Sequence, residues 1–361
     1  MNGRDRNTAV ILALQHTDRI SQKKREGLLG LVPEPSALLS REFEREVRNI
    51  TGEAAEEFFA LAADADRLFD RAEKAGVSWI TCLDEEFPAQ LREISPMPTL
   101  LFVKGNVGAL GGFGIAVVGT RKPTRYGLKL ADMFSRELAR AGITVISGFA
   151  RGIDTAAHKA CIESGAPTVA VFGCGADVCY PAENRALYEQ IAESGGAVVS
   201  EYPPGFKPLQ YRFPERNRII SGLARGVFIP EAAKRSGSLI TAEFALEQGR
   251  DVFVAPGNVF AEESGGTNQL LRTMPHALVL SPEDILEHYR MTPKERVEKG
   301  QTEQMTVEEN LVIAVLRRGE AHFEELLAET GLATSALTDV LVGLELSGIA
   351  EQTNGNYYSL C

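Results

Sequence analysis

The chain has 361 residues, of which 44% are hydrophobic and 24% charged, and its formal net charge is −11. This composition is typical of a globular protein, and the length predicts two or three domains. The apolar run at 9–14 is short and flanked by polar residues, so we expect neither a membrane span nor a signal peptide. Five scattered cysteines predict reduced thiols, no metal site and a cytoplasmic protein.

Charge is distributed unevenly along the chain. Residues 1–110 contain 14 basic and 18 acidic side chains, and residues 306–361 contain 2 basic and 9 acidic side chains. Residues 111–305 contain 22 of each sign. The acidic excess therefore lies in the flanks, and the neutral central part can present a basic face.

The central part of the sequence predicts a doubly wound α/β domain. Its helical stretches alternate with seven runs rich in β-branched residues, at 115–118, 144–147, 168–172, 197–200, 226–229, 251–255 and 277–280. This alternation is typical of a mostly parallel sheet covered on both faces. In the first helical stretch, Leu130, Phe134 and Leu138 form one apolar stripe that ends near Gly142.

Glycines and cations follow several of these strands. Ligands bind beyond the carboxyl ends of the strands in such sheets. The segments are GTRKPTRYG with Arg121 and Lys122, SGFARGIDTAAH with Gly148, Arg151 and Gly152, KPLQYRFPERNR at 207–218, and PEAAKRSGSLITA with Lys234 and Ser236. Helix amino termini would add further anion affinity, so together the segments predict a phosphate-binding rim.

The segment 207–218 concentrates what binding an extended polyanion requires. We expect a surface loop whose cations Lys207, Arg212, Arg216 and Arg218 meet phosphates. Its aromatic residues Tyr211 and Phe213 could stack on bases, although Phe213 could equally pack beneath the loop.

Other polar residues near these strands have a structural interpretation as well as a functional one. His158 is expected to be a packing histidine, because no nucleophile motif accompanies it. Asp154 is expected at a helix start, with a contact to Arg151 as an option. Glu231 could be a base, but no second carboxylate is tied to it by sequence. Gly148 could be simply a turn residue.

The order of the segments is more specific than any one of them. GTRKPTRYG, SGFARGIDTAAH, VFGCGADVCYPAEN, SEYPPG, FPERNRIISGL, EAAKRSGSLITAEFAL and APGNVFAEESGGTNQLLR together resemble the DNA-processing family known as DprA or Smf, over about 100–280. The resemblance implies an extended Rossmann-like domain that binds single-stranded DNA and forms homodimers. It also implies help in loading the RecA recombinase during natural transformation, without catalysis and without a cofactor.

The resemblance also implies which residues form the DNA-binding pocket. They are Arg121, the glycines of SGFARGID (Gly148 and Gly152), Phe213, Arg216, Asn217 and Arg218. Two positions depart from the family pattern. Glu215 stands where the family usually has a basic residue, for which Arg212 could compensate, and TMPHA follows Arg272 where a Gly-Ala pair is usual.

The flanks predict two smaller domains. Residues 1–75 are helical in pattern and are similar to the sterile-alpha-motif-like module of the family, ahead of the main domain at 76–290. Residues 291–305 are polar and predict a linker. Residues 306–361 predict three helices and a two-stranded wing turning at Asn354 and Gly355, which resembles a winged helix. Its third helix contains Asp339 and Glu345 but no Lys or Arg, so we expect it to contact protein rather than duplex DNA.

Two other classes of function are weighed against DNA binding. The dinucleotide fingerprint is absent after the first strand, and the P-loop motif is absent throughout. A hydrolase that cleaves nucleoside monophosphates at the sugar-base bond has a similar sheet, but its glycine-rich segment is represented here only by the altered SGGTNQ. A pure interaction scaffold, the third class, would have no affinity for nucleic acid.

Overall fold

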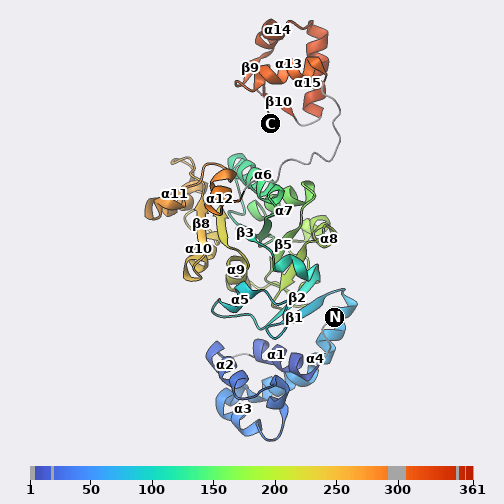
Figure 1. Ribbon diagram of the computed structural model, residues 1–361, viewed down its shortest axis with the longest axis vertical. Helices are drawn as coiled ribbons and strands as arrows, with labels where there is room; N and C mark the ends of the chain where they lie inside the picture. The colour runs from blue at the N-terminus through green and yellow to red at the C-terminus, as the bar shows by residue number, and fades with distance from the viewer. Residues whose placement is uncertain (1–4, 18–19, 292–305, 347–348, 354, 361) are drawn as a thin grey trace. The chain divides into compact units, whose positions relative to one another are not determined.

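The computed structural model describes residues 5–17, 20–291, 306–346, 349–353 and 355–360 (Figure 1). The chain divides into two compact units, Met1–Glu295 and Arg296–Cys361. The domain boundary predicted at residue 75 falls inside the first unit and stays a prediction. The predicted linker lies outside the described residues from residue 292 onward.

The first unit is built around an eight-stranded sheet in the order β1-β2-β6-β5-β4-β3-β7-β8. The strands are β1 Ser78–Thr81, β2 Leu100–Gly105, β3 Gly114–Val117, β4 Thr144–Ser147, β5 Thr168–Phe172, β6 Ala197–Ser200, β7 Gly226–Ile229 and β8 Asp251–Val254. From β6 to β8 all neighbours are parallel, and β2 and β1 extend the sheet antiparallel beside β6. The predicted mostly parallel α/β sheet is confirmed.

The sequence-based assignment was wrong at one expected strand and missed two. Residues 277–280 do not form a strand, because Pro275 begins a 3₁₀ turn that ends at Ala277, and Leu278 makes only an isolated bridge to Val254. Proline fixes φ and donates no hydrogen bond, which favours the turn. The antiparallel strands β1 and β2 were not predicted.

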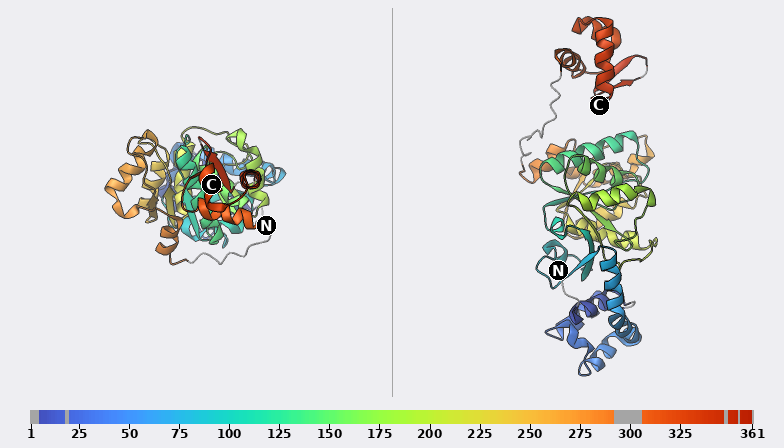
Figure 2. Two further views of the ribbon diagram at one scale, coloured as in Figure 1. Left: turned by 90° about the horizontal axis from the view of Figure 1, so that it is seen from above. Right: turned by 90° about the vertical axis from the view of Figure 1, so that its right-hand side faces the viewer.

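Helices cover both faces of the sheet (Figures 1 and 2). In the first unit they are α1 Arg6–His16, α2 Gln22–Gly30, α3 Glu44–Thr51, α4 Ala55–Lys74, α5 Ala89–Arg92, α6 Arg125–Arg140, α7 Ile153–Glu163, α8 Arg185–Glu193, α9 Arg212–Leu223, α10 Ser238–Glu247, α11 Gly265–Thr273 and α12 Pro282–His288. Side chains alternate along each strand. Ala116 and Val118 therefore enter the apolar cluster beneath α9 and α10, whereas Ile115 and Val117 enter the cluster beneath α6 and α7.

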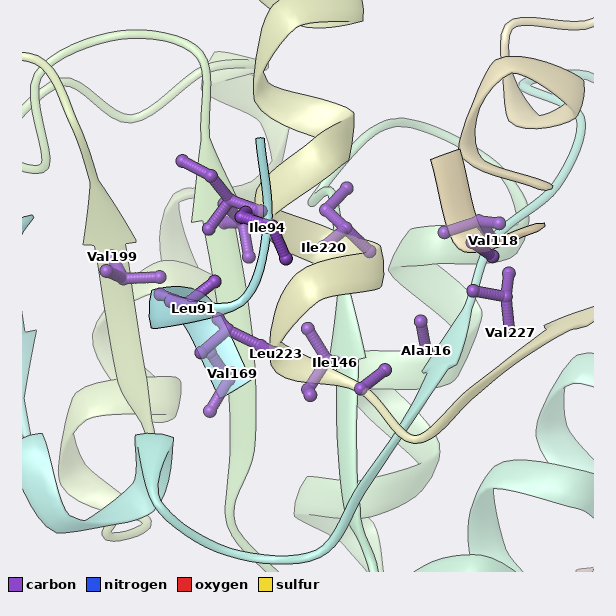
Figure 3. Close-up of a cluster of buried hydrophobic side chains, with 14 of the residues drawn as sticks. Leu91, Ile94, Ala116, Val118, Ile146, Val169, Val199, Ile220, Leu223 and Val227 are labelled. Carbon is purple, nitrogen blue, oxygen red and sulfur yellow. The ribbon is translucent and has the colours of Figure 1, made fainter. Parts of the chain in front are cut away.

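Helix α9 is fixed to the sheet by its apolar side. Ile220 and Leu223 are each 1% exposed and pack against Ile146 and Val169 in the cluster shown in Figure 3. Burying a side chain of this size contributes about 1.5–3 kcal/mol. The amino-terminal turns of α9 are thereby held in place at the edge of the functional site described below.

The amino-terminal helices are joined to the sheet by packing and by hydrogen bonds. Ile11 and Leu12 of α1 share an apolar cluster with residues of β2. Gln15, at the end of α1, donates to the Leu100 carbonyl at 2.9 Å and to the Glu201 carbonyl at 3.1 Å. Its amide oxygen accepts from the Leu100 N–H at 2.9 Å, so both the nitrogen and the oxygen of this buried amide have hydrogen-bond partners.

The second unit has the winged-helix arrangement that the sequence predicts. It contains α13 Val307–Leu316, β9 Ala321–His322, α14 Phe323–Thr330, α15 Thr334–Leu346, β10 Ala350–Thr353 and β11 Tyr357–Leu360. Strands β10 and β11 pair antiparallel as the wing, and β9 pairs with β11. Asn354, in the predicted turn, lies outside the described residues.

Within the described ranges, no single helix is long and apolar enough to cross a membrane, although α14 with Thr334–Glu345 passes that test as a pair bent by 113°.

Candidate functional site

The order in which strands are added to the sheet reverses at β3. From β3 the strands run outward through β4, β5 and β6, and the chain then returns to place β7 and β8 on the other side of β3. Ligands bind at such switch points, beyond the carboxyl ends of the strands. A pocket of about 750 Å³ lies there, lined by Gly119 and Thr120 after β3, Ala150 after β4 and the amino-terminal ends of α9 and α10.

The turn after β4 supports the first wall of the pocket, to which Ala150 contributes, although Gly148 and Gly152 of this turn do not line the pocket themselves. Gly152 has a φ of +79°, which favours glycine, and a Cβ there would lie 2.4 Å from the Thr120 carbonyl oxygen. Phe149 has a φ of +60° although it is not glycine. Such a conformation costs about 1–3 kcal/mol and persists only where the surroundings impose it. The Phe149 ring is fully buried, 5.0 Å from the ring of Phe172, which fixes the turn.

The floor of the pocket is a buried carboxylate and a buried guanidinium. Asp154 accepts from the N–H groups of Gly148 at 3.1 Å and Ala150 at 3.2 Å. Burial raises the pKa of Asp154 to about 6, and the Arg216 guanidinium acts in the opposite direction. Arg216 is 5% exposed and donates to the carbonyls of Gly148, at 2.8 Å, and Val171. Arg216 therefore ties α9 to the ends of β4 and β5.

Phe213 lies above this floor, half-buried, among cations and another ring. The Arg121 guanidinium lies 5.8 Å and that of Arg216 6.0 Å from the centre of the Phe213 ring. The Tyr180 ring lies 5.6 Å away, and Tyr180 is 47% exposed. Arg121 and Lys122 are exposed on the rim. This arrangement offers aromatic faces beside unburied positive charge.

The opposite wall is the start of α10. Ser236, Gly237 and Ser238 line the pocket there, and the Ser236 and Ser238 hydroxyls lie 2.8 Å apart. Asn217 of α9 donates to the Gly237 carbonyl at 3.3 Å, which joins the two helices. The amino terminus of a helix carries a partial positive charge that favours anions. Arg235 adds a side chain to this wall, whereas the neighbouring exposed Lys234 does not line the pocket.

The segment 207–218 is not wholly a loop, which corrects the sequence prediction. Helix α9 begins at Arg212, and Pro214 fits its first turn, where backbone N–H groups have no partner inside the helix. Phe213, Arg216 and Asn217 share one side of α9 and line the pocket. Arg212 and Arg218, expected in the same site, face the other side.

These two arginines have their own contacts. The Arg218 side chain is 8% exposed and pairs with that of Glu201 at 2.6 Å and 2.7 Å. Arg212 donates to the Lys207 carbonyl at 2.9 Å, and its guanidinium lies 4.6 Å from the centre of the Tyr202 ring. Neither lines the pocket at the switch point.

Two further candidates, Arg151 and His158, are occupied in structural contacts. Arg151 pairs with Glu183 at 2.7 Å, forms no ion pair with Asp154 and does not line the pocket. His158 is fully buried with its Nδ1 2.8 Å from the Thr168 hydroxyl, and burial lowers its pKa to about 3. The packing role predicted for His158 agrees with these contacts.

Glu231 has a helix-capping role that the sequence did not indicate. It is 1% exposed, and its two carboxylate oxygens accept from the N–H and the hydroxyl of Thr124, both at 2.7 Å. A Cβ on Gly127 would lie 2.4 Å from this carboxylate. Glu231 therefore joins the end of β7 to the start of α6.

Sequence reasoning missed several lining residues, namely Thr120, Tyr180, Gln210, Arg235, Glu262 and Glu263. Tyr180 stands in the quoted segment VFGCGADVCYPAEN after β5, where an exposed aromatic residue could have been recognised. Glu262 and Glu263 reduce the positive charge of the rim. In the described part of the chain no group of three or more His, Cys, Asp or Glu could hold a metal ion.

The fold and the pocket together define a doubly wound α/β protein with a cationic, aromatic pocket at its switch point. The family model for DNA recombination-mediator protein A matches residues 78–290, and that for the DprA winged helix domain matches residues 298–356. The chain belongs to the DprA/Smf family of DNA-processing proteins.

Individual relatives are consistent with this assignment. The chain is 33% identical to Protein Smf of Synechocystis over an alignment 320 residues long, which covers 78% of this chain and 79% of that protein. It is 47% identical to Protein Smf of Escherichia coli over 206 residues, which are 57% of this chain and 55% of that protein. The chain therefore spans just over half the length of the E. coli relative.

Two solved structures are similar. The X-ray structure of DNA processing protein A from Streptococcus pneumoniae has a TM-score of 0.68 and 35% identity, covering 79% of this chain and 98% of that one. DNA processing protein A from Helicobacter pylori, described for its single-stranded DNA binding mode, has a TM-score of 0.54 and 29% identity, covering 59% of this chain and 95% of that one.

Proposed function

We propose that this protein binds single-stranded DNA in the pocket at the switch point of its sheet. The observation that carries the proposal is the position of Phe213, whose ring lines the pocket beside Arg121 and Tyr180. A paired base cannot offer its face to such a ring, so single strands should bind better than duplexes. The single-stranded DNA binding described for the H. pylori relative supports the same assignment.

The exposed cations would hold the phosphates. Arg121, Lys122 and Arg235 line the rim beside the start of α10, and each phosphate that they neutralise would release condensed counterions. Binding should therefore weaken steeply with salt and depend little on sequence. Arg216 would act beneath them as a positioning residue, because its guanidinium is occupied by backbone carbonyls.

The proposed role is non-catalytic. The alternative, a nucleoside monophosphate hydrolase, would use Glu231 as its base, and both carboxylate oxygens of Glu231 are instead engaged by Thr124. A phosphoribohydrolase assay with adenosine monophosphate separates the two functions. Turnover that disappears in Glu231→Gln, with the protein still folded, would establish the enzyme and refute the proposal.

By family membership we further propose that the protein acts in the cytoplasm as a homodimer and helps to load a RecA-type recombinase on single strands during natural transformation or related DNA processing. Two pockets on one strand would raise affinity through effective concentration. Adding the protein to strands coated with single-strand-binding protein should shorten the lag before RecA ATP hydrolysis. Sedimentation equilibrium measures the dimer directly.

Binding assays test the central proposal. Fluorescence anisotropy at fixed salt should rank single-stranded DNA above duplex DNA, with RNA of the same length as a third ligand. Arg121→Ala should weaken single-strand binding, whereas Arg67→Ala should not, since the Arg67 side chain on α4 is 79% exposed and outside the pocket. Equal affinity for single strand and duplex, or no effect of Arg121→Ala, would contradict the proposal.

A further inference from the structure

A second pocket of about 800 Å³ lies on the other side of α9. The ends of α1, the start of α2, part of α4 and the segment after β6 surround it. The residues of α9 that line it, Arg212, Glu215 and Arg218, alternate with those that line the first pocket. One helix therefore separates two pockets and contributes cationic side chains to both.

Aromatic rings surround a cation in this second pocket. The Arg212 guanidinium carbon lies 4.6 Å from the centre of the Tyr202 ring, 5.2 Å from that of Phe206 and 5.7 Å from that of Tyr211. The buried Nε of Arg212 has no hydrogen-bond partner among the described residues. Tyr211 is 58% exposed, so its ring is available to a ligand from solvent.

The charges of the second pocket leave two cations available. Glu201 is taken up by Arg218, and Glu215 accepts from the Tyr202 hydroxyl at 3.1 Å. Arg25 and Arg212 both line the pocket, and neither forms an ion pair with a carboxylate in the described ranges. Arg25 donates to the Ile20 carbonyl at 3.1 Å, and burial lowers its pKa.

The pocket is therefore not a simple anion trap. Glu57 and Glu215 lie in its wall, which disfavours a ligand consisting of negative charge alone. The ring of His16 adds to the aromatic lining at 6.0 Å from that of Phe206, and it stays neutral at pH 7 because burial lowers its pKa to about 4. Rings with a few cations match a ligand that brings both a flat aromatic group and a phosphate.

We propose that the second pocket binds a nucleotide unit, with the base against Tyr211 and its neighbouring rings and the phosphate at Arg25 and Arg212. The inference rests on the proposed function, because the nearest source of such a unit is the strand held in the first pocket. Gln210 and Phe213 line the first pocket while Tyr211 and Arg212 line the second, so the pockets meet across the first turn of α9. A free nucleotide has the same chemistry.

The distance is within reach of a short strand. A helix with its side chains is about 10 Å across, and stacked nucleotides advance about 3.4 Å each. About three linking nucleotides should therefore be needed between the unit in the first pocket and the unit in the second, so a strand needs about five nucleotides to engage both. Short oligonucleotides fill only the first pocket, and longer ones engage both.

The test compares oligothymidylates of 4 and 12 nucleotides with the full-length chain. Tyr211→Ala and Arg25→Gln should each weaken binding of the 12-mer about fivefold or more and leave 4-mer binding within twofold. Arg67→Ala, which removes an exposed charge outside both pockets, should change neither. Photocrosslinking of a 12-mer carrying 5-iododeoxyuridine to the wild-type chain should label Tyr211 or Tyr202, and this readout does not depend on the folding of a variant.

Two further arms separate the sources and the possible failures. If the second pocket takes a free nucleotide, thymidine monophosphate should bind the Arg121→Ala variant, and adding Tyr211→Ala to that variant should abolish this binding. If the 12-mer shows the expected effects and the mononucleotide does not bind, the second pocket takes its nucleotide from the strand. Absence of a length effect, of crosslinks and of mononucleotide binding would overturn the inference while single-strand binding in the first pocket stands. No affinity for the 4-mer or the 12-mer would instead refute the proposed function.

Discussion

Truncation of Phe213 to alanine is the sharpest test of the first pocket. The ring is half-buried and contacts groups of the site rather than the apolar core, with Arg121 at 5.8 Å and Tyr180 at 5.6 Å. Stacking of one base on an aromatic side chain contributes about 1–3 kcal/mol. Phe213→Ala should therefore weaken binding of a single strand about 5- to 150-fold at fixed salt.

The assay is anisotropy of a labelled oligothymidylate, with urea unfolding of the same variant to measure stability. Truncating a fully buried phenylalanine costs about 3–5 kcal/mol, and Phe213 should cost less because it is only half-buried. Phe260→Ala is a matched control, since Phe260 is 94% exposed and lines neither pocket. An affinity within twofold of the wild type, in a folded variant, would refute stacking on Phe213.

Four other changes test separate parts of the argument. Arg121→Ala should make the slope of log affinity against log salt shallower by about 0.7, as expected when one phosphate contact on a single strand is lost, and an unchanged slope would contradict that contact. Arg218→Ala should lower the free energy of unfolding by about 3–5 kcal/mol in urea titrations, because it leaves Glu201 buried and unpaired; a loss below 1 kcal/mol would show that the pair is unimportant. Burial lowers the pKa of His158 in the folded chain to about 3, below its usual 6.5. The stability that the neutral ring contributes is therefore fully present above pH 6.5 and is lost as the pH falls toward 3. In urea titrations at each pH, the free energy of unfolding of the wild type should therefore fall by up to about 1.4 kcal/mol per pH unit more than that of His158→Gln across that range. Parallel curves of this free energy against pH would contradict burial of a neutral ring. Removing everything after Gln304, which includes the 2 basic and 9 acidic residues of 306–361, should leave single-strand affinity within about twofold, and a large loss would assign that unit a role in binding.

The central sheet could be predicted because its strands are short β-branched runs between glycine-rich turns, as at 144–147 and 168–172. The antiparallel strands β1 and β2 were missed because they lie outside the alternation of strands and helices, and β1 pairs with a single neighbour at the edge of the sheet. The composition at 277–280 favoured a strand. No strand formed there, because Pro275 begins a 3₁₀ turn and only Leu278 makes a bridge to a neighbouring strand. Composition does not reveal whether a partner strand exists.

The candidate site was predicted in its elements but not in its orientation. Treating 207–218 as a loop placed all its cations in one site, whereas helical spacing from Arg212 onward puts Phe213 and Arg216 on one side and Arg218 on the other. That spacing was present in the sequence, but Pro214 favoured a loop because proline usually interrupts a helix, although it is tolerated in the first turn. The pairing of Arg218 with Glu201 joins separate elements and could not have been deduced without coordinates.

The buried Arg216 has a consequence for how binding competence is acquired. Its guanidinium joins the turn after β4, the end of β5 and the start of α9, three elements that come together only in the assembled sheet. The ligand-binding surface therefore forms only when the sheet is assembled, and it is lost when the domain unfolds. The fraction of chains able to capture a strand should follow the fluorescence of Trp79, the single tryptophan of the chain and a residue of β1, point by point through a denaturant titration. Strand capture then serves as a direct count of chains whose first unit is native.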